Sequence, residues 1–457
     1  MNKFNIILYV LLLAGSLAAC KKSEKQLIHF TLSESNLQLK AGETQRLNVQ
    51  GDLSLDLLEK MQWKSTHPEV AQVNNEGSVQ ALKEGTTEII AKYASFADTC
   101  VVQVTGTDQT SPLHLDGLDQ PLSAFSIFSK AVHLKAPKNS FQSFDFDQSG
   151  NIYYAQMGVV NGYKDGESKA YEMYIFKGLP NTQVVDHYMT LNYIGHMSNI
   201  AVEQDNGTTY VWVNSNATRN PGGGYGNAQS VSRVKYEDGK VYTEGYAGES
   251  FFFPGKTALQ PAIDKANDLL CINTTSGSDR YFYVFKLSEA MALPVKDFTV
   301  TVNIGGLEAG TSLHSVTRTV PGRDLGALTP VGQFIVHKGS NQQEDVNSFP
   351  LQGFDIDGPF IYFQEGLGYD VTTEGKPSQA YVTVFDLEGH IVGSRTKVTA
   401  IQDADALVQA GLSNSSGYME PEGIKIKGNQ IYLGYASRNG SNDDKYANIL
   451  SIAAERE

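Results

Sequence analysis

Cysteine is scarce in this chain, which has only three such residues among 457. They are Cys20, Cys100 and Cys271, and none of them lies in a CxxC pair or joins histidines at the spacing of a zinc site. A structural zinc centre of the usual kind is therefore excluded. Cys100 and Cys271 could form a disulfide in an oxidising compartment, but two buried free thiols are the favoured interpretation.

Basic segments and familiar catalytic motifs are also missing. The chain has 36 Lys and Arg residues against 50 Asp and Glu residues, a formal net charge of -14, and no long basic run follows residue 26. An acidic surface repels phosphate backbones, so nucleic acid is not an expected partner. The sequence contains no GxSxG elbow, no HExxH motif and no P-loop, which excludes these three kinds of catalytic site.

What the chain does have is a sheet-forming composition. Hydrophobic residues make up 41% of it, with 23 Tyr, 21 Phe and 43 Gly. Aromatic residues favour strands and glycine favours tight turns, and no convincing amphipathic helix accompanies them. The predicted fold class is all-β, and a length of 457 residues predicts two or three domains.

The N-terminus has the layout of an export signal. Lys3 is basic, residues 6–13 form an almost unbroken apolar run, and small residues then lead to Leu17-Ala-Ala-Cys20. The apolar run is too short for a transmembrane helix. The segment resembles the lipobox of bacterial lipoproteins, which implies a signal peptide at 1–19, acylation of Cys20 and attachment to a membrane through the acyl chains. An ordinary secretory signal with a chance cysteine is the alternative.

Residues 20–26 follow as a short charged tether that should hold the folded part away from the bilayer. The expected location is the cell envelope, at the outer membrane. Acidic residues after the cysteine direct some lipoproteins to the surface, and Lys21 and Lys22 do not match that pattern. The periplasmic and the surface face therefore both stay open.

The first folded unit is expected at 27–107. Apolar and polar residues alternate through four segments, as in strands: 37–49, 70–82, 86–94 and 99–106. Several short strands within some 80 residues predict a sandwich. The pattern from Trp63 onwards, WKS, VAQV, GSVQA and GTTEI, resembles the bacterial Ig-like group 2 (BIG2) domain. The resemblance implies that Trp63 belongs to the core with Val70, Val73, Val79 and Ile89, and that the unit acts as a stalk or an adhesive module.

The second unit, 108–457, contains an internal repeat. Three segments share one strand–turn–strand pattern, in which a polar residue opens the first strand and an Ile-Tyr pair marks the second: 142–154, 352–363 and 422–433. Weaker copies start near Ser198 and Gln260. Five such hairpins followed by further strands predict a five-bladed β-propeller, with an insertion around 305–347. Their spacing is uneven, so six blades or a distorted sandwich remain alternatives.

The hairpins QGFDIDGPFIYFQ and EPEGIKIKGNQIYLGYA carry a second resemblance. They are similar to the five-bladed propellers of phage receptor-binding proteins, of teichoic-acid biosynthesis protein C and of helveticin-type bacteriocins. Members of that group are associated with cell-wall or surface glycans, so the resemblance implies carbohydrate binding.

The residues that open the repeats are the predicted ligand-binding site. The first strand of each propeller blade lines the central channel, so these positions should form a ring of amide and carboxylate groups suited to sugar hydroxyls: Gln142, Ser198, Gln260, Gln352 and Glu422. The alternative is that they only satisfy the backbone and water at the channel wall. Tyr225, in a glycine-rich stretch, is a candidate for stacking on a sugar ring.

Evidence for a metal or for catalysis is weaker. The segment Asp145–Gly150 resembles the start of a calcium loop, but Gln156 stands where the loop needs a glutamate, so an ordinary turn is favoured over Ca²⁺. Glu365, Glu420 and Glu422 could pair for glycoside hydrolysis, although no catalytic residue can be assigned. Three functions are therefore open: glycan binding, which is favoured, a polysaccharide lyase or glycoside hydrolase, and a protein-interaction scaffold.

Overall fold

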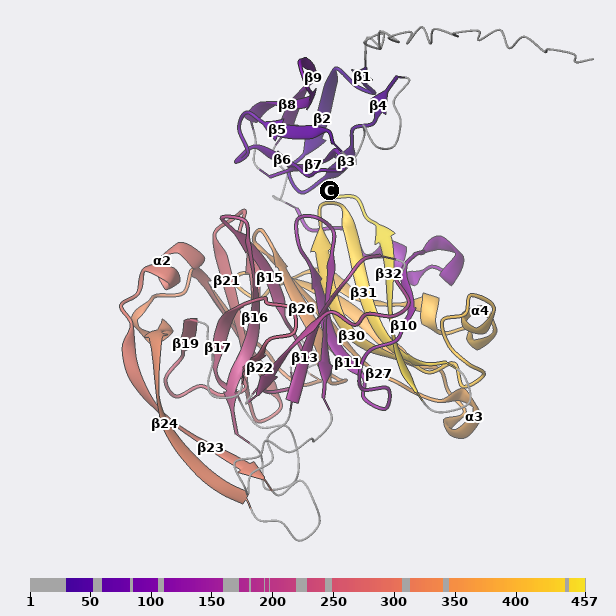
Figure 1. Ribbon diagram of the computed structural model, residues 1–457. Coiled ribbons are helices and arrows are strands. Elements are labelled where there is room, and N and C mark those ends of the chain that lie inside the picture. The colour runs from indigo at the N-terminus through magenta and orange to yellow at the C-terminus, as the bar shows by residue number, and fades with distance from the viewer. Residues whose placement is uncertain are drawn as a thin grey trace, which may run out of the picture.

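The computed structural model contains two β-rich units, with the smaller one above the larger in Figure 1. The smaller unit carries the N-terminal part of the described chain, and the larger unit carries all that follows residue 110. The structure describes residues 30–51, 60–82, 85–105, 111–158, 172–180, 182–192, 194–196, 198–218, 228–242, 249–305, 313–339, 345–439 and 444–456.

The smaller unit is a sandwich of two sheets with one additional strand pair. One sheet has the order β2 (Asn36–Lys40), β9 (Phe96–Thr105), β8 (Gly85–Tyr93) and β5 (Gln62–Ser65). The other has the order β3 (Thr44–Arg46), β7 (Ser78–Ala81) and β6 (Ala71–Val73), and β1 (Thr31–Leu32) pairs with β4 (Val49–Gln50). Alternating burial along β2 and β8 places one face of each strand in the core, as the sequence pattern predicts.

The core of this unit includes the residues expected from the sequence. Val79 and Ile89 are fully buried, and Trp63, Val70 and Val73 pack against the core while partly exposed. Gly77 has a φ of 80°, and a Cβ there would lie 2.6 Å from the Trp63 ring, so the tryptophan packs over a position that only glycine can occupy. Cys100, in the same core, is a free thiol, as is the buried Cys271 of the larger unit.

The described residues of the larger unit form five sheets, each of which is open rather than closed into a barrel. The first has the order β11 (Phe141–Phe146), β12 (Ile152–Met157), β13 (Glu172–Gly178), β14 (Tyr188–Asn192) and β18 (Val241–Tyr242). The second has the order β15 (Ala201–Asp205), β16 (Thr208–Ala217), β17 (Ala228–Lys235), β19 (Glu249–Phe252), β24 (Leu313–Asp324) and β23 (Lys296–Gly305).

The other three sheets have four strands each, and in the last of them a strand from the start of the unit joins strands from the end of the chain. The third contains β20 (Gln260–Asp264), β21 (Leu269–Ser276), β22 (Asp279–Lys286) and β25 (Gly332–Val336). The fourth contains β26 (Leu351–Asp357), β27 (Phe360–Leu367), β28 (Gln379–Asp386) and β29 (Ile391–Lys397). The fifth contains β30 (Met419–Lys427), β31 (Gln430–Arg438), β32 (Lys445–Ala453) and β10 (Ser126–Val132).

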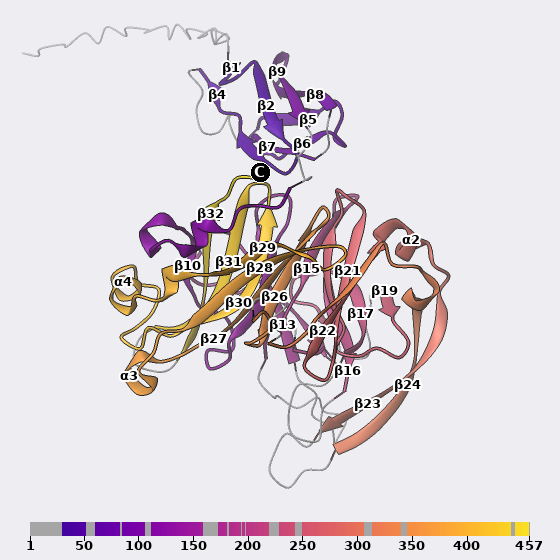
Figure 2. The ribbon, with the colours of Figure 1, turned by 180° about the vertical axis from the view of Figure 1, so that it is seen from behind.

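The predicted repeats correspond to the first hairpin of every sheet. The three clear copies are β11–β12, β26–β27 and β30–β31, and the two weaker copies are β15–β16 and β20–β21. We call the first strand of each sheet its inner strand, because these strands contact one another in sequence order and β30 also contacts β11: β11, β15, β20, β26 and β30. Figure 2 shows the same sheets from behind.

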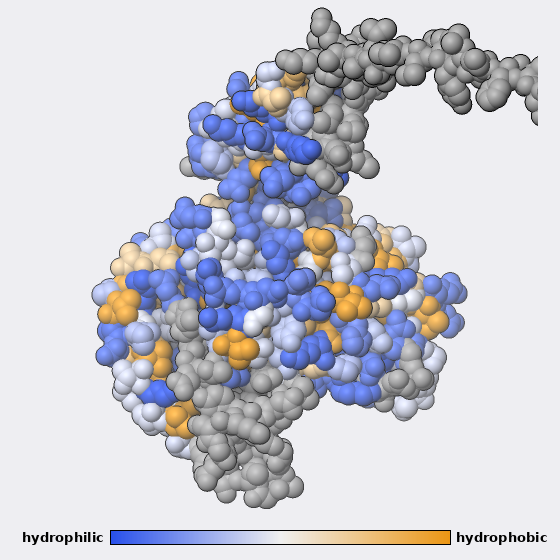
Figure 3. Space-filling view, in the orientation of Figure 1, coloured by the Kyte–Doolittle hydropathy of each residue, from blue (hydrophilic) through white to orange (hydrophobic). Residues whose placement is uncertain are grey.

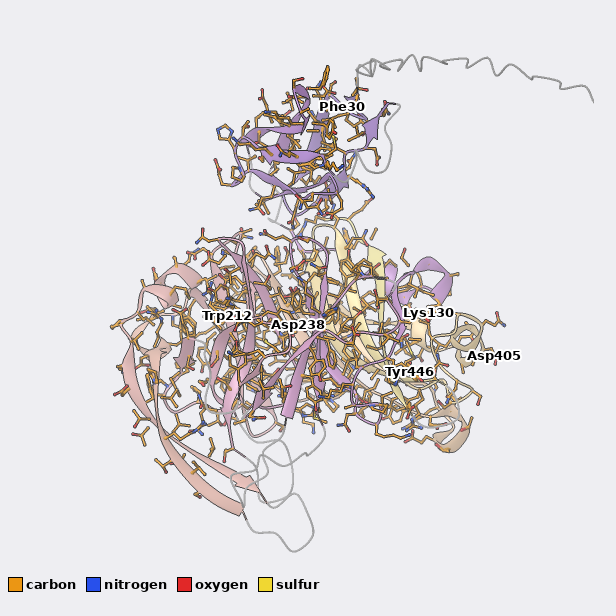
Figure 4. The ribbon with its side chains drawn as sticks, viewed as in Figure 1. Phe30, Lys130, Trp212, Asp238, Asp405 and Tyr446 are labelled. Carbon is orange, nitrogen blue, oxygen red and sulfur yellow. The ribbon has the colours of Figure 1, made fainter. Side chains whose placement is uncertain are left out.

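Apolar clusters join each sheet to the next. Trp212 of the second sheet packs with Phe285 of the third, for example, and Phe282 of the third packs with Phe354 of the fourth. A further cluster joins the fifth sheet to the first, through residues such as Ile449 and Phe144. Trp212 is fully buried, and Figure 4 places it among the strands of the larger unit. Hydrophobic burial between sheets is thus the main cohesive contribution.

Hydrogen bonds and ion pairs also link neighbouring inner strands. Asp145 accepts a hydrogen bond from the backbone N–H of Val202 at 2.7 Å, and Asp355 accepts one from Ile426 at 2.8 Å. Lys427 lies 3.1 Å from Asp145 and so ties the fifth sheet back to the first. Further links include the Asn199 amide to the Pro261 carbonyl, the Gly358 N–H to Asp264, and Lys425 to Asp355.

The insertion expected around 305–347 differs in bounds and in kind, because a long hairpin starts at Lys296 and ends at Asp324, while β25 within the expected range belongs to the third sheet. Strands β23 and β24 pair along their length and extend from the side of the second sheet, as Figure 1 shows. Phe298 of β23 stacks on Phe252 at 4.1 Å, which holds the hairpin against the sheet. Helices are short in the described part of the chain: α2 (Leu287–Ala292), α3 (Val371–Glu374) and α4 (Ala404–Gln409).

The predicted all-β class and N-terminal Ig-like sandwich are confirmed by this architecture. The surface seen in Figure 3 is mostly hydrophilic, with scattered apolar residues and no broad apolar face on that side. None of the helices among the described residues is long and apolar enough to span a membrane. The propeller itself remains a prediction, because each sheet is open when considered alone.

Candidate binding cavity

One cavity brings together all five residues that open the predicted repeats. It has a volume of about 550 Å³ and lies where the inner strands begin. Its described lining includes Gln142, Ser198, Gln260, Gln352 and Glu422, one from the start of each repeat. The remaining lining residues are Ser140, Met157, His196, Asn214, Ala228, Ala258, Thr275, Arg280, Pro350, Leu351, Leu367 and Glu420. We refer to it as the opening cavity.

Irregular strand pairing explains how three of these side chains reach the cavity. In β11 the residues on either side of Gln142 pair with adjacent residues of β12, so Gln142 is an extra residue in its strand. Gln352 is the extra residue in β26, and Glu422 lies in the matching irregular segment of β30. A β-bulge redirects a side chain without ending the strand, and here it does so at equivalent positions in three sheets.

Glycine allows the fourth and fifth sheets to meet beside the cavity. A Cβ added to Gly353 would lie 2.7 Å from the Cα of Gly423, closer than any side chain allows. Gly423 itself has a φ of 125°, which a residue with a side chain rarely adopts. The Gln-Gly and Glu-Gly pairs of the repeats thus combine a residue that faces the cavity with one that permits close strand packing.

Two carboxylates lie side by side on β30. Glu420 and Glu422 both line the cavity, and the Tyr418 hydroxyl donates a hydrogen bond to Glu420. Burial raises the pKa of Glu422 well above its usual range and the Glu420 charge raises it further, while Lys445 acts in the opposite direction. The Glu422 carboxyl therefore holds its proton to a higher pH than an exposed glutamate does. Glu365, the third predicted carboxylate, is not among the lining residues and instead pairs with Arg395 at 2.7 Å.

His196 contributes an imidazole to the lining of the opening cavity. Its side chain is exposed within the cavity, but surrounding protein reduces its hydration and lowers its pKa, and the nearby Glu420 charge opposes that shift. The imidazole is thus kept neutral near pH 7. No Phe, Tyr or Trp occurs among the described residues of the lining, so hydrogen-bonding groups rather than stacking platforms dominate it.

Several polar groups of the lining lack partners. Within the described part of the chain, Gln260 Oε1, Asn214 Oδ1 and Arg280 Nε have no hydrogen bond although each atom is buried. The Gln142 side-chain amide donates a hydrogen bond to the Phe141 carbonyl, and the Gln352 side-chain amide donates one to the Gly366 carbonyl. Buried polar groups are normally satisfied, so unpaired acceptors and a donor in one cavity are characteristic of a site that receives a ligand.

The sequence interpretation missed Asn214, Thr275 and Arg280. Asn214 and Thr275 lie on second strands, β16 and β21, whose apolar run turns polar as it approaches the cavity. That change, visible in VWVNSN and LLCINTTS, was a usable signal. Arg280 is the second residue of β22 and lies opposite Thr275 in the β21–β22 hairpin, and no sequence pattern distinguishes it from the other arginines of the chain.

A second cavity, of about 710 Å³, lies where the inner strands end. It is lined by the turns after those strands, including Gly150, Lys265 and Gly428, and by Gly42 and Gln80 of the Ig-like unit. We call it the junction cavity. The smaller unit thus stands over one end of the inner strands while the opening cavity lies at the other, in agreement with its place in Figure 1.

The segment that resembles a calcium loop borders the junction cavity. Asp147 Oδ1 accepts hydrogen bonds from the backbone N–H groups of Ser149 and Asn151, and Oδ2 accepts from the Asn151 amide and the Tyr153 hydroxyl. Its oxygens are thus engaged within the turn and the adjoining strand, an arrangement expected of a turn-capping aspartate. The other candidates, Cys20 and Tyr225, lie outside the described residues.

Comparison with known proteins identifies the first unit. Residues 29–102 match the model of the bacterial Ig-like domain (group 2), which confirms the resemblance carried by Trp63 and the strands after it. The match covers that unit alone. Among curated proteins, no relative matches the chain.

Solved structures give only distant likenesses. A protein of unknown function from Dyadobacter fermentans is 10% identical, with 72% of this chain and 99% of that one covered at a TM-score of 0.33. A DUF4623 family protein from Bacteroides eggerthii is 10% identical over 90% of each chain at a TM-score of 0.26. Domains 5–6 of the S-layer protein SbsC are 10% identical over 65% of this chain and 98% of that one, at 0.15. Scores this low carry no argument about function.

Proposed function

We propose that this protein is an envelope lipoprotein that binds a surface glycan in the opening cavity, with the Ig-like unit as its stalk. The observation that carries the proposal is the convergence of five repeat-opening residues, one per sheet, on a single polar cavity. Amide and carboxyl groups are suited to the dense hydroxyls of sugars. A volume of about 550 Å³ is within the range of small-ligand sites and would hold a short stretch of an oligosaccharide.

A five-bladed propeller is the arrangement we propose for the larger unit. The proposal is supported by the cyclic order of contacts between the sheets, since apolar clusters join consecutive sheets and one cluster joins the fifth sheet to the first. Strand β10 completes the fifth sheet from the other end of the unit, which would fasten the ring non-covalently. In such a ring the inner strands line a central channel, and the opening cavity is its mouth.

The binding proposal is tested with glycan arrays and with two variants in solution. Gln352→Ala and Glu422→Ala each remove one hydrogen-bonding group from a buried site, which costs about 1–3 kcal/mol of binding free energy. We expect affinity for a glycan identified on the array to fall about five-fold or more, since a factor of ten corresponds to about 1.4 kcal/mol. Unchanged affinity with a large loss of thermal stability would instead make these residues structural.

The membrane anchor and the stalk form a separate part of the proposal. The export-signal pattern that ends at Cys20 and the Ig-like match at 29–102 support a lipid-anchored protein of the envelope. Acylation requires the Cys20 thiol, so Cys20→Ser should move the protein from the detergent phase to the aqueous phase on partitioning. Unaltered partitioning of this variant would contradict the anchor.

Glycoside cleavage in the same cavity is the second candidate function. It is favoured by one observation, the proximity of Glu422, whose pKa is raised, to the more exposed Glu420. A protonated acid beside an ionised carboxylate is the pairing that hydrolysis of a glycosidic bond requires. Incubation with polysaccharides, followed by measurement of new reducing ends, tests it. Cleavage that disappears in Glu422→Gln while binding persists would favour the enzyme.

A further inference from the structure

Arg280 is an unpaired cation in the wall of the opening cavity. Its side chain is partly buried, and within the described chain it makes no hydrogen bond or ion pair, with Nε fully shielded from solvent. Burial lowers the pKa of the guanidinium, which nevertheless keeps its charge because a free arginine deprotonates only far above neutral pH. A buried charge without a partner costs free energy, and proteins normally pair it.

Neighbouring acidic groups do not supply the missing partner. Asp279, the adjacent residue, holds His337 at 2.9 Å and the Lys338 N–H at 3.1 Å. Glu420 accepts a hydrogen bond from the Tyr418 hydroxyl, and burial raises the pKa of Glu422 well above its usual range, which disfavours its charged form. Both glutamates belong to the fifth sheet, whereas Arg280 belongs to the third, which is not adjacent to it.

We infer that the glycan bound in the opening cavity is acidic, and that Arg280 pairs with its anionic group. The inference rests on the proposed function and specifies the substrate class. A guanidinium binds a carboxylate or a sulfate through two parallel N–H···O bonds, and the two terminal nitrogens of Arg280 are the ones that an anion in the cavity can reach. The protein's net charge of -14 would otherwise disfavour an acidic ligand, which makes an unpaired arginine in this cavity significant.

The rest of the lining fits the uncharged part of such a sugar. Gln260 and Asn214 line the cavity and have unpaired amide oxygens just beneath its surface, which a small side-chain rotation would bring to ligand hydroxyl groups. Glu422, whose pKa is raised by burial, can donate from its carboxyl to a ring or glycosidic oxygen when it holds its proton. Gln142 and Gln352 add amides on either side of it in the order of the sheets. One ligand carrying both an anion and several hydroxyls would therefore satisfy groups on opposite parts of the wall.

Two sources of the anion share this chemistry, the carboxylate of a uronic acid and a sulfate ester. A short oligogalacturonide, its fully methyl-esterified form and a sulfated galactan oligosaccharide distinguish them, and the esterified probe removes the charge while leaving the rings intact. Titration calorimetry with the full chain is the measurement. We expect at least one anionic probe to bind about ten-fold or more tightly than the ester, which corresponds to one charge-assisted hydrogen-bond pair.

Variants of Arg280 assign the preference to that residue. In Arg280→Met, the affinity for the charged probe should lie within about two-fold of the affinity for the ester. Arg280→Lys should recover part of the difference in affinity, because lysine keeps the charge without the bidentate geometry. Arg46→Met, on the Ig-like unit, is the matched control and should leave all affinities unchanged. Thermal unfolding of each variant confirms that the fold is retained.

The outcomes separate this inference from the proposed function. Equal affinity for the charged and esterified probes, or a preference that survives in Arg280→Met, overturns the inference. Binding of neutral glycans with rejection of both anionic probes also overturns it but leaves glycan binding intact. Failure of every neutral, uronate-bearing and sulfated glycan on an array to bind overturns both.

Discussion

The two ends of the inner strands use polar side chains in opposite ways. Where the strands end, at the junction cavity, the carboxylates of Asp145, Asp264 and Asp355 accept hydrogen bonds from backbone N–H groups of neighbouring sheets. Where the strands begin, at the opening cavity, Gln260 and Arg280 have buried polar atoms without partners. Strand β20 shows the contrast within one strand, with Gln260 unpaired at its start and Asp264 hydrogen-bonded at its end.

This contrast separates residues that hold the sheets together from residues that can act on a ligand. A polar side chain that is satisfied inside the protein has few remaining interactions to offer, and its removal leaves its partner unpaired. An unsatisfied side chain reduces stability slightly in the empty protein and recovers that free energy on binding. Substitutions at the two ends should therefore alter stability and affinity in opposite proportions.

The largest expected effect is a loss of stability from Asp355→Ala at the junction end of β26. The variant leaves the ammonium of Lys425, which is 1% exposed and 3.3 Å from Asp355, buried without its counter-charge. It also removes the acceptor of the Ile426 N–H. We expect a loss of about 3–5 kcal/mol in the free energy of unfolding, measured by denaturant titration.

Gln352→Ala on the same strand is the matched variant at the opening end. It removes one hydrogen bond to the Gly366 carbonyl and should cost about 1 kcal/mol or less. Asp355→Asn keeps an acceptor and should fall between the two. Equal losses for Asp355→Ala and Gln352→Ala would break the contrast between the ends.

A smaller effect, dependent on pH, is expected for Glu422→Gln. Burial and the Glu420 charge raise the pKa of Glu422 in the folded state. The stability that the Glu422 carboxyl contributes is therefore complete below its unfolded-state pKa of about 4.3, and it is lost as the pH rises through its folded-state pKa. Glutamine stays neutral, so the variant should be more stable than the parent at pH 8, by about 1.4 kcal/mol per unit of pKa displacement. At pH 4 the two should be alike.

Thermal unfolding across this pH range provides the measurement, with Glu289→Gln as the control because Glu289 is exposed on α2. A stability difference independent of pH would mean that Glu422 does not titrate between pH 4 and pH 8. A parent more stable than the variant at pH 8 would indicate a bound cation or another compensating partner.

Local sequence patterns predicted the hairpins because their causes are local. Alternating apolar residues with Gly or Asn turns fix β11–β12, β26–β27 and β30–β31 regardless of what surrounds them. The Ig-like pattern was equally readable, since Trp63 and Gly77 contact each other within one small unit. The repeat then placed five residues at equivalent strand starts, which is why their convergence could be predicted.

Relations between sheets could not be obtained in that way. Pairing of β10 with β32 joins segments more than 300 residues apart, and no periodicity indicates it. The pKa of Glu422 depends on burial by other sheets, and the availability of Arg280 depends on Asp279 bonding elsewhere. Glu365 illustrates the converse, because its pairing with Arg395 removes a residue that sequence proximity to the repeat had suggested for the site.

The smallest effect on stability, and the sharpest form of the contrast, is expected for Gln260→Met. Gln260 Oε1 is buried without a partner, so an apolar side chain of similar length removes an unsatisfied acceptor without opening a cavity. Stability should stay the same or rise by up to about 1 kcal/mol, since an unmade hydrogen bond costs the fold about that much. Affinity for the glycan should fall about five-fold or more, because the acceptor is then missing when the ligand arrives.

A matched substitution can be made at the junction end of the same strand. Asp264 accepts hydrogen bonds from the Gly358 N–H at 2.7 Å and the Asn267 amide at 2.6 Å, so Asp264→Leu should destabilise the fold without changing affinity for a ligand at the other end. Measuring the free energy of unfolding and, by titration calorimetry, the glycan affinity of both variants tests whether the two ends differ in this way. A Gln260→Met protein that is less stable but binds as well as the parent would contradict this prediction. The residues that open the repeats would then have a structural role, and Arg280 would lie outside any binding site.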